Sequence, residues 1–133
     1  MRRAIGDYVG GVSKVSSDVY FTDNPIASNW YDGPLSELSK TYSRTVSATY
    51  SCTTTVSAEV LDAGLSFSVT DSATESTTWK RPAITASQRI NVKEYGVYDK
   101  YAFTVYNILG KEKGTGNAYK PMGLYVAQAT YSK

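Results

Sequence analysis

The sequence contains no histidine and only one cysteine, Cys52. Without histidine the chain lacks the usual general base of Ser–His and Cys–His nucleophilic sites. It also lacks the His and Cys clusters that zinc requires. A single cysteine cannot form an internal disulfide, and we expect Cys52 to be a small buried side chain. We therefore expect a protein that is not an enzyme and that has no catalytic residues, metal or cofactor.

Charge and long apolar runs are also scarce. The chain has 14 basic and 12 acidic residues in 133, a formal net charge of +2. Nucleic-acid binding needs clustered Lys and Arg, so we do not expect a nucleic acid as partner. No run approaches the roughly 20 apolar residues of a membrane helix. Arg2 and Arg3 are followed by glycines and Asp7 instead of an apolar stretch, so we expect no export signal in this chain. Its Tyr-, Ser- and Thr-rich composition still favours a secreted, extracellular protein.

The length suits one domain. Residues 1–40 show no sustained period, and the segments 23–25 and 29–34 have turn chemistry. We expect a short strand at 18–22 and one helical turn at 35–38. Residues 1–40 are thus predicted to be an irregular N-terminal arm with turns, and residues 41–133 an antiparallel β domain.

From Thr45 to Val60 the sequence alternates with period two: even positions are mostly apolar and odd positions mostly carry hydroxyl groups, which predicts a strand with one dry face. After residues 61–64 the alternation resumes with the opposite parity. This predicts a long hairpin with a four-residue loop, in which Val60 lies opposite Leu65. The predicted apolar face contains Val46, Val56, Val60, Leu65, Phe67, Val69 and Trp79, with Val46 opposite Trp79 and Val56 opposite Val69.

Shorter alternating segments follow. We expect strands at 88–97, 101–105 and 124–130, a bend at 98–100 and a polar, glycine-bearing loop at 111–117. The predicted fold class is therefore all-β: an antiparallel β-sandwich or an elongated twisted sheet, with a long Ser/Thr-faced hairpin and an irregular N-terminal arm.

The polar face of the predicted hairpin carries no charge over residues 45–58. Ordinary solvated strands carry Lys and Glu, which discourage pairing between sheet edges. Hydroxyl groups suit a face that meets water, neighbouring copies or a lumen without burying charge. Asp71 and Glu75 fall on the apolar parity, which weakens the hairpin as a membrane-spanning element. Plain solvent exposure in a sandwich is the simpler alternative.

Aromatic residues supply the candidate binding site. Trp30 and Tyr31 lie in a segment rich in Gly, Pro and Asn, and Tyr98 lies in a tyrosine-rich stretch. Such rings stack on sugars or lie at a membrane–water boundary. The alternative is that they are ordinary core or strand-face residues.

The run SATYSCTTTVSAEVLDAGLSFSVTDSATESTTWKRPAI resembles the β-rich region of aerolysin-type (epsilon-toxin/mosquitocidal) pore-forming proteins. The resemblance lies in long strands of alternating Ser/Thr and small apolar residues, with no specific motif, and it covers residues 40–110. It implies a secreted protein that binds a receptor, oligomerises and inserts a hairpin to form a pore. The chain is also similar to small secreted β-sandwich proteins of Gram-positive bacteria.

Three functions remain open. The first is a secreted β-protein that binds or self-assembles at a surface, and its most specific version is a pore-forming protein. The second is a structural self-assembling subunit of a filament or surface layer, whose arm 1–40 docks on a neighbour's sheet edge. The third is a carbohydrate-binding module. The expected partners are other copies of the chain, and a membrane surface or a glycan.

Overall fold

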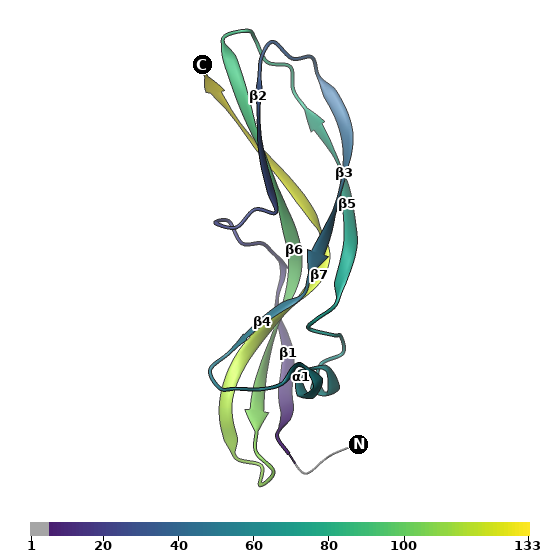
Figure 1. Ribbon diagram of the computed structural model, residues 1–133, viewed down its shortest axis with the longest axis vertical. Coiled ribbons are helices and arrows are strands. Elements are labelled where there is room, and N and C mark those ends of the chain that lie inside the picture. Colours follow the sequence, from purple (N-terminus) through teal and green to yellow (C-terminus); the bar gives the residue numbers. More distant parts are fainter. Residues whose placement is uncertain (1–5) are drawn as a thin grey trace. The chain divides into compact units, whose positions relative to one another are not determined.

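The computed structural model describes residues 6–133 and has an antiparallel all-β fold, as the sequence predicts (Figure 1). Most of the chain is extended, and a single short helix interrupts the strands of this described part. The elements are β1 (Tyr8–Val19), β2 (Ala27–Asp32), β3 (Leu38–Ser47), β4 (Thr49–Cys52), α1 (Ala58–Gly64), β5 (Ser72–Arg81), β6 (Gln88–Tyr106) and β7 (Glu112–Ser132).

The predicted irregular arm is wrong for the described part of residues 1–40, and residues 1–5 lie outside the description. β1 pairs with β6 from Tyr8↔Tyr106 to Val19↔Tyr98, and β2 pairs with β6 from Ala27↔Glu94 to Asp32↔Arg89. The predicted helical turn at 35–38 is also absent, because Leu35 bridges Ile84 and Leu38 begins β3. Pairing with a distant strand supplied the order that local periodicity did not reveal.

The chain divides into two compact units, and neither corresponds to the predicted boundary at residue 40. The first unit contains residues up to 19, 47–73 and 98–121, and the second contains 20–46, 74–97 and 122–133. β6 and β7 contribute residues to both units. Sequence periodicity gives no sign of this division, because it depends on which distant segments pack together.

The first unit is a sheet in the order β1-β6-β7-β4, with α1 packed on it. Leu61 and Leu65 bring the helix onto Phe103 and Val105 of β6. A Cβ on Gly64 would lie 2.6 Å from Cβ of Val9, so only glycine allows the helix end this close to β1.

The second unit has two sheets packed face to face. Its larger sheet contains β2, β6 and β7, and its smaller sheet contains β3 and β5. Ile90 and Val92 of β6 lie in the core, and Tyr42 of β3 and Trp79 of β5 pack against them. The rings of Tyr42 and Trp79 meet edge to face, with centroids 5.9 Å apart.

β6 is a single 19-residue strand, so the predicted bend at 98–100 is wrong. Tyr98 and Lys100 remain in the ladder opposite Val19 and Ser16 of β1. Asp99 is buried and forms an ion pair with Lys14 at 3.6 Å, which explains how a charged residue is kept within the strand.

The predicted polar loop at 111–117 is also wrong, because β7 begins at Glu112. Its glycines lie in the strand where another segment comes close. A Cβ on Gly114 would lie 2.6 Å from Oγ1 of Thr53, and a Cβ on Gly116 would lie 2.6 Å from Cζ of Phe103. These glycines therefore mark close packing within the sheet and not a turn.

An ion pair joins an exposed arginine of the second unit to a buried carboxylate. The guanidinium of Arg44 on β3 donates two hydrogen bonds of 2.9 Å to the carboxylate of Glu94 on β6, whose side chain is 1% exposed. The hydrogen bond to Glu94 raises the pKa of Arg44, so its guanidinium stays charged. Burial raises the pKa of the neighbouring Tyr42, which stays neutral. The pair connects the two sheets of this unit.

Replacing Arg44 with Ala is expected to destabilise the protein by about 2 kcal/mol, because the buried carboxylate of Glu94 loses its bidentate partner. Partial exposure of Arg44 keeps the loss below that of a fully buried pair. Urea unfolding followed by circular dichroism measures it. The control is Lys80→Ala, which breaks an exposed pair with Glu37 and should cost less than about 1 kcal/mol. Equal losses in the two variants would contradict the role given to the Arg44–Glu94 pair.

Candidate functional site

The candidate site is the segment 48–71, which connects the paired strands β3 and β5. Its only charged residues are Glu59, Asp62 and Asp71. The predicted hairpin is wrong here: the strand stops at Cys52, residues 58–64 form α1, and residues 65–71 have no regular structure apart from a turn. We call residues 48–71 the connecting segment. Its sequence has the alternation of two strands, but most of it folds as a helix and irregular structure.

Local capping explains why α1 forms despite the alternating pattern. Ser57 is the N-cap, and its hydroxyl accepts a 3.2 Å hydrogen bond from the backbone N–H of Val60. Glu59 places a negative charge in the first turn, where the helix dipole favours it. A seven-residue helix is unstable by itself in water. Its stability must therefore come from packing.

Asp62 holds the helix to the residues that follow it. One carboxylate oxygen accepts a 2.9 Å hydrogen bond from the backbone N–H of Val69, and the other accepts one from the hydroxyl of Ser68 at 3.3 Å. Both contacts fold residues 65–69 back toward the helix. The sequence analysis missed this role, although Ser57 and Glu59 ahead of Leu61 were a capping signal that could have revealed the helix.

Three side chains of the connecting segment complete the core of the first unit. Leu61, Leu65 and Val69 are buried, and they pack with Phe103, Val105 and Ala118 of β6 and β7. Cys52 is half-buried beside the same cluster. Val56 and Phe67 of the predicted hairpin face also pack against it. The apolar face predicted from the alternation is therefore used, but against the sheet and not as a hairpin.

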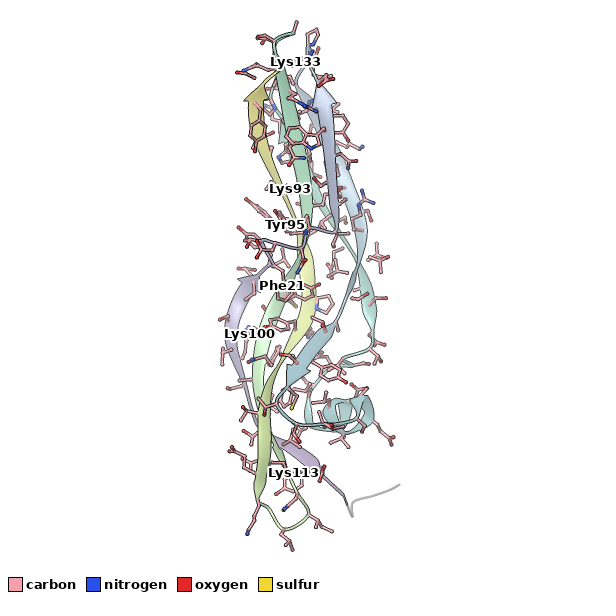
Figure 2. All side chains as sticks on the ribbon, turned by 60° about the vertical axis from the view of Figure 1, so that its left-hand side comes forward. Phe21, Lys93, Tyr95, Lys100, Lys113 and Lys133 are labelled. Carbon is pink, nitrogen blue, oxygen red and sulfur yellow. The ribbon has the colours of Figure 1, made fainter. Side chains whose placement is uncertain are left out.

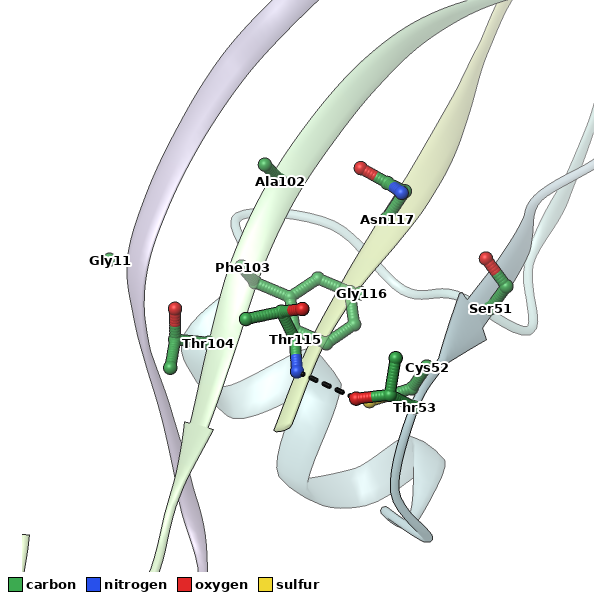
Figure 3. Close-up of a pocket in the computed structure, with 10 residues that line it drawn as sticks. All are labelled: Gly11, Ser51, Cys52, Thr53, Ala102, Phe103, Thr104, Thr115, Gly116 and Asn117. Carbon is green, nitrogen blue, oxygen red and sulfur yellow. Dashed lines mark hydrogen bonds between the residues drawn. The ribbon is translucent and has the colours of Figure 1, made fainter. Parts of the chain in front are cut away.

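The connecting segment meets the sheet at the edge of β7. β4 pairs with β7 over four positions, from Thr49↔Tyr119 to Cys52↔Gly116. Beyond them, the Thr53 N–H donates to the Thr115 carbonyl at 2.9 Å, and the Thr115 N–H donates to Oγ1 of Thr53 at 3.0 Å. A concavity of about 440 Å³ lies over this junction (Figure 3). Its lining is uncharged: Gly11, Ser51, Cys52, Thr53, Ala102, Phe103, Thr104, Thr115, Gly116 and Asn117.

At the base of the connecting segment, the β3–β5 pairing defines a register. The hydroxyls of Thr41 and Thr78 are 3.1 Å apart, and the Ala48 N–H donates to the Asp71 carbonyl at 2.9 Å. The predicted pairing of Val46 with Trp79 is therefore wrong by six positions. Val60 opposite Leu65 is also wrong, since Val60 lies in α1 and the N–H of Leu65 caps that helix. The predicted face is correct for both strands, because the even-numbered Val46 and the odd-numbered Trp79 are the less exposed positions.

The three predicted binding residues have different surroundings, and Tyr98 belongs to a different unit from Trp30 and Tyr31. Trp30 is exposed and contacts Tyr131, and the Arg89 guanidinium lies 4.4 Å from its ring centre. Tyr31 follows it on β2 and so points to the opposite face of the sheet. Tyr98 is buried in the first unit, and this burial raises its pKa. One face of the Trp30 ring therefore already has a cationic partner.

Comparison of the chain with protein-family models and with curated proteins finds no match. In residues 6–133 no helix is long and apolar enough to span a membrane. Within the same residues, no group of three or more His, Cys, Asp or Glu side chains lies close enough together to hold a metal ion.

Replacing Asp62 with Ala is expected to loosen the connecting segment, because the N–H of Val69 and the hydroxyl of Ser68 lose their acceptor. We expect a loss of about 1–2 kcal/mol. Hydrogen–deuterium exchange should become faster in residues 58–70, with little change in β3 and β5. The control is Glu59→Ala, which removes an exposed carboxylate from the first turn of the same helix. It should leave exchange at 65–70 unchanged. Unchanged exchange at 65–70 in the Asp62 variant would contradict the clamping role.

Proposed function

We propose that this chain is a secreted, non-enzymatic protein that self-assembles on membranes and forms a pore with its connecting segment. The observation that carries this proposal is the ladder end at Ala48 and Asp71. The two ends of the connecting segment are already paired in antiparallel register there. The rest of it can extend that ladder only as a hairpin.

Continuing the ladder in its present register pairs Tyr50 with Val69 and Cys52 with Phe67, and reaches a two-residue turn at 59–60. Each new pair keeps apolar residues on one face. That face would contain Ala48, Tyr50, Cys52, Thr54, Val56, Ala58, Leu61, Ala63, Leu65, Phe67 and Val69. The other face would be uncharged apart from Asp62 beside the turn.

The length of the extended hairpin also fits a membrane. Beyond the Ala48–Asp71 pair, residues 49–58 and 61–70 give ten residues in each strand, and a membrane-spanning strand needs about 9–11. In this register Asp71 lies at the base of the hairpin and Glu75 lies in β5 below it. The carboxylates that weakened the sequence-based hairpin therefore fall outside the apolar stretch.

In the folded state this segment is held by packing on the sheet, by the Asp62 hydrogen bonds and by the pairing of β4 with β7. Leu61, Leu65 and Val69 would leave the core of the first unit and exchange protein contacts for lipid contacts. Their departure uncovers Phe103 and Val105, so the change costs free energy unless a membrane or neighbouring copies compensate. The connecting segment should therefore change into the extended hairpin only at a membrane or among assembled copies.

The alternative functions have less support. Filament formation through a free N-terminal arm conflicts with β1, which already pairs with β6. β1 also has register shifts, and Gly11 and Asp18 have positive φ, features that disrupt further pairing along an edge. Glycan binding through Trp30 must compete with the Arg89 contact.

A reversible disulfide tests the proposal. Ser51 and Asn117 face each other across β4 and β7 and both line the concavity (Figure 3). Opposed residues in such ladders have Cα atoms about 4.5–5.5 Å apart, a separation that a disulfide spans. In a Cys52→Ser background, Ser51→Cys with Asn117→Cys would join the connecting segment to β7.

Oxidised, this locked variant should release dye from liposomes at least roughly tenfold more slowly than the Cys52→Ser control, because an opening cost of about 1.4 kcal/mol already gives that factor. Dithiothreitol should restore release and SDS-resistant oligomers. Equal release by the oxidised and reduced forms would refute the mechanism. Absence of both leakage and oligomers in the Cys52→Ser control, on every lipid mixture tried, would refute the function.

A further inference from the structure

The turn between β6 and β7 has a well-defined geometry. The Gly110 N–H donates to the Asn107 carbonyl at 2.9 Å, and the Asn107 N–H donates to the Lys111 carbonyl at 2.8 Å. The side chain of Asn107 accepts hydrogen bonds from the backbone N–H groups of Leu109 and Lys111. Gly110 has φ of +80°, as the glycine after such a turn does. Four hydrogen bonds thus fix the backbone of residues 107–111, here called the hairpin tip.

The two central residues of the hairpin tip are aliphatic and project into solvent. Ile108 is 58% exposed and Leu109 is 81% exposed, the largest value among the large hydrophobic residues described. Turn positions of this kind normally have Gly, Pro, Asn, Asp or Ser. The fold does not need Ile or Leu there, because neither packs in a core cluster of the described chain. Their exposure therefore indicates that these two side chains contact a binding partner.

Next to the two apolar side chains of the hairpin tip lie tyrosine rings, and lysine side chains follow them. Tyr8 and Tyr106 stack beside it with ring centroids 5.3 Å apart, and the Tyr8 hydroxyl lies 3.6 Å from the position of a Cβ on Gly110. Lys111 and Lys113 follow along the chain toward and into β7 (Figure 2 labels Lys113 near the tip). Tyrosine and lysine with these neighbours are typical of a membrane–water interface, where rings lie among headgroups and ammonium groups reach water.

We propose that the hairpin tip docks the protein on a lipid bilayer by inserting Ile108 and Leu109 below the headgroups. This inference rests on the proposed function and adds the element that first contacts the membrane. A protein partner fits less well, because two side chains on a convex turn offer far less area than the roughly 800 Å² per partner of a stable interface. Two inserted aliphatic side chains give weak, reversible binding, which many assembled copies would strengthen.

The charges near the hairpin tip indicate which lipids suffice. Lys113 pairs with Asp7 at 2.6 Å, and Glu112 lies next to Lys111, so the positive charge is largely balanced. Binding should therefore occur on zwitterionic phosphatidylcholine vesicles and persist at salt of about 0.5 M, since apolar insertion is not screened. Phosphatidylserine should strengthen it only modestly.

The test compares the double variant Ile108→Ser/Leu109→Ser with the matched control Ile26→Ser/Met122→Ser, which removes two exposed apolar side chains of the second unit. Cosedimentation with phosphatidylcholine vesicles should show at least a roughly tenfold weaker partition coefficient for the tip variant, since two buried aliphatic side chains are lost. The control should bind like the wild type. Both variants should keep the wild-type melting temperature, because all four positions are exposed.

A second readout does not depend on loss of binding. Leu109→Trp should show a blue-shifted emission on adding vesicles and quenching by brominated lipid, relative to the parent with Trp30 and Trp79 alone. Unchanged partition of the tip variant, or emission from the introduced tryptophan that vesicles leave unaltered, overturns the inference. Altered self-association in place of altered vesicle binding would also overturn it and assign the hairpin tip to a contact between copies.

The two proposals fail in different ways. The oxidised locked variant should bind vesicles like the wild type and release dye more slowly, whereas the tip variant should be weakened in both binding and release. If the locked variant blocks leakage while the tip variant binds normally, the docking inference falls and the pore remains. If the wild type binds through its tip and never releases dye, the pore falls and docking remains.

Discussion

The structure depends on one strand, β6, whose two faces are largely covered along its length. Phe103 and Val105 form part of the core of the first unit, and Ile90 and Val92 form part of the core of the second. β1 and β2 pair with successive stretches of β6, so each needs β6 in place before it has a partner. Because hydrophobic burial is the dominant favourable term in folding, this central strand explains why segments far apart in sequence share each unit.

The connecting segment depends on β6 in a different way. Its alternation favours two strands, and its local capping favours a short helix. The apolar face of the sheet decides between them by burying Leu61, Leu65 and Val69. A sequence in which local preference and tertiary structure disagree has a smaller energy gap to the alternative conformation. Natural chains usually keep such disagreement where a conformational change is used. The register at Ala48 and Asp71 gives that change a direction, because the extended ladder is already started.

Docking and conversion, as proposed, belong to separate parts of the first unit. The hairpin tip is the turn between β6 and β7, while the connecting segment is the chain between β3 and β5. A rigid turn suits docking, because presenting Ile108 and Leu109 requires no rearrangement and costs little entropy. A seven-residue helix suits conversion, because it is unstable by itself and depends on its surroundings. This division lets attachment precede the costly step of uncovering the core.

The sequence by itself determined the all-β class, the strands around residues 88–97, 101–105 and 124–130, and the dry faces of the strands that contain Val46 and Trp79, because alternation is a local property. It also indicated the uncharged character of residues 45–58. Only the tertiary structure decided that residues 8–19 form a strand, that Ala58–Gly64 is a helix, and that Tyr98 is buried while Trp30 and Tyr31 are exposed. These features depend on contacts with distant partners, and periodicity along the chain has no information about those partners. The same limit applied to the register, which differs by six positions from the one that symmetry about residues 61–64 predicted.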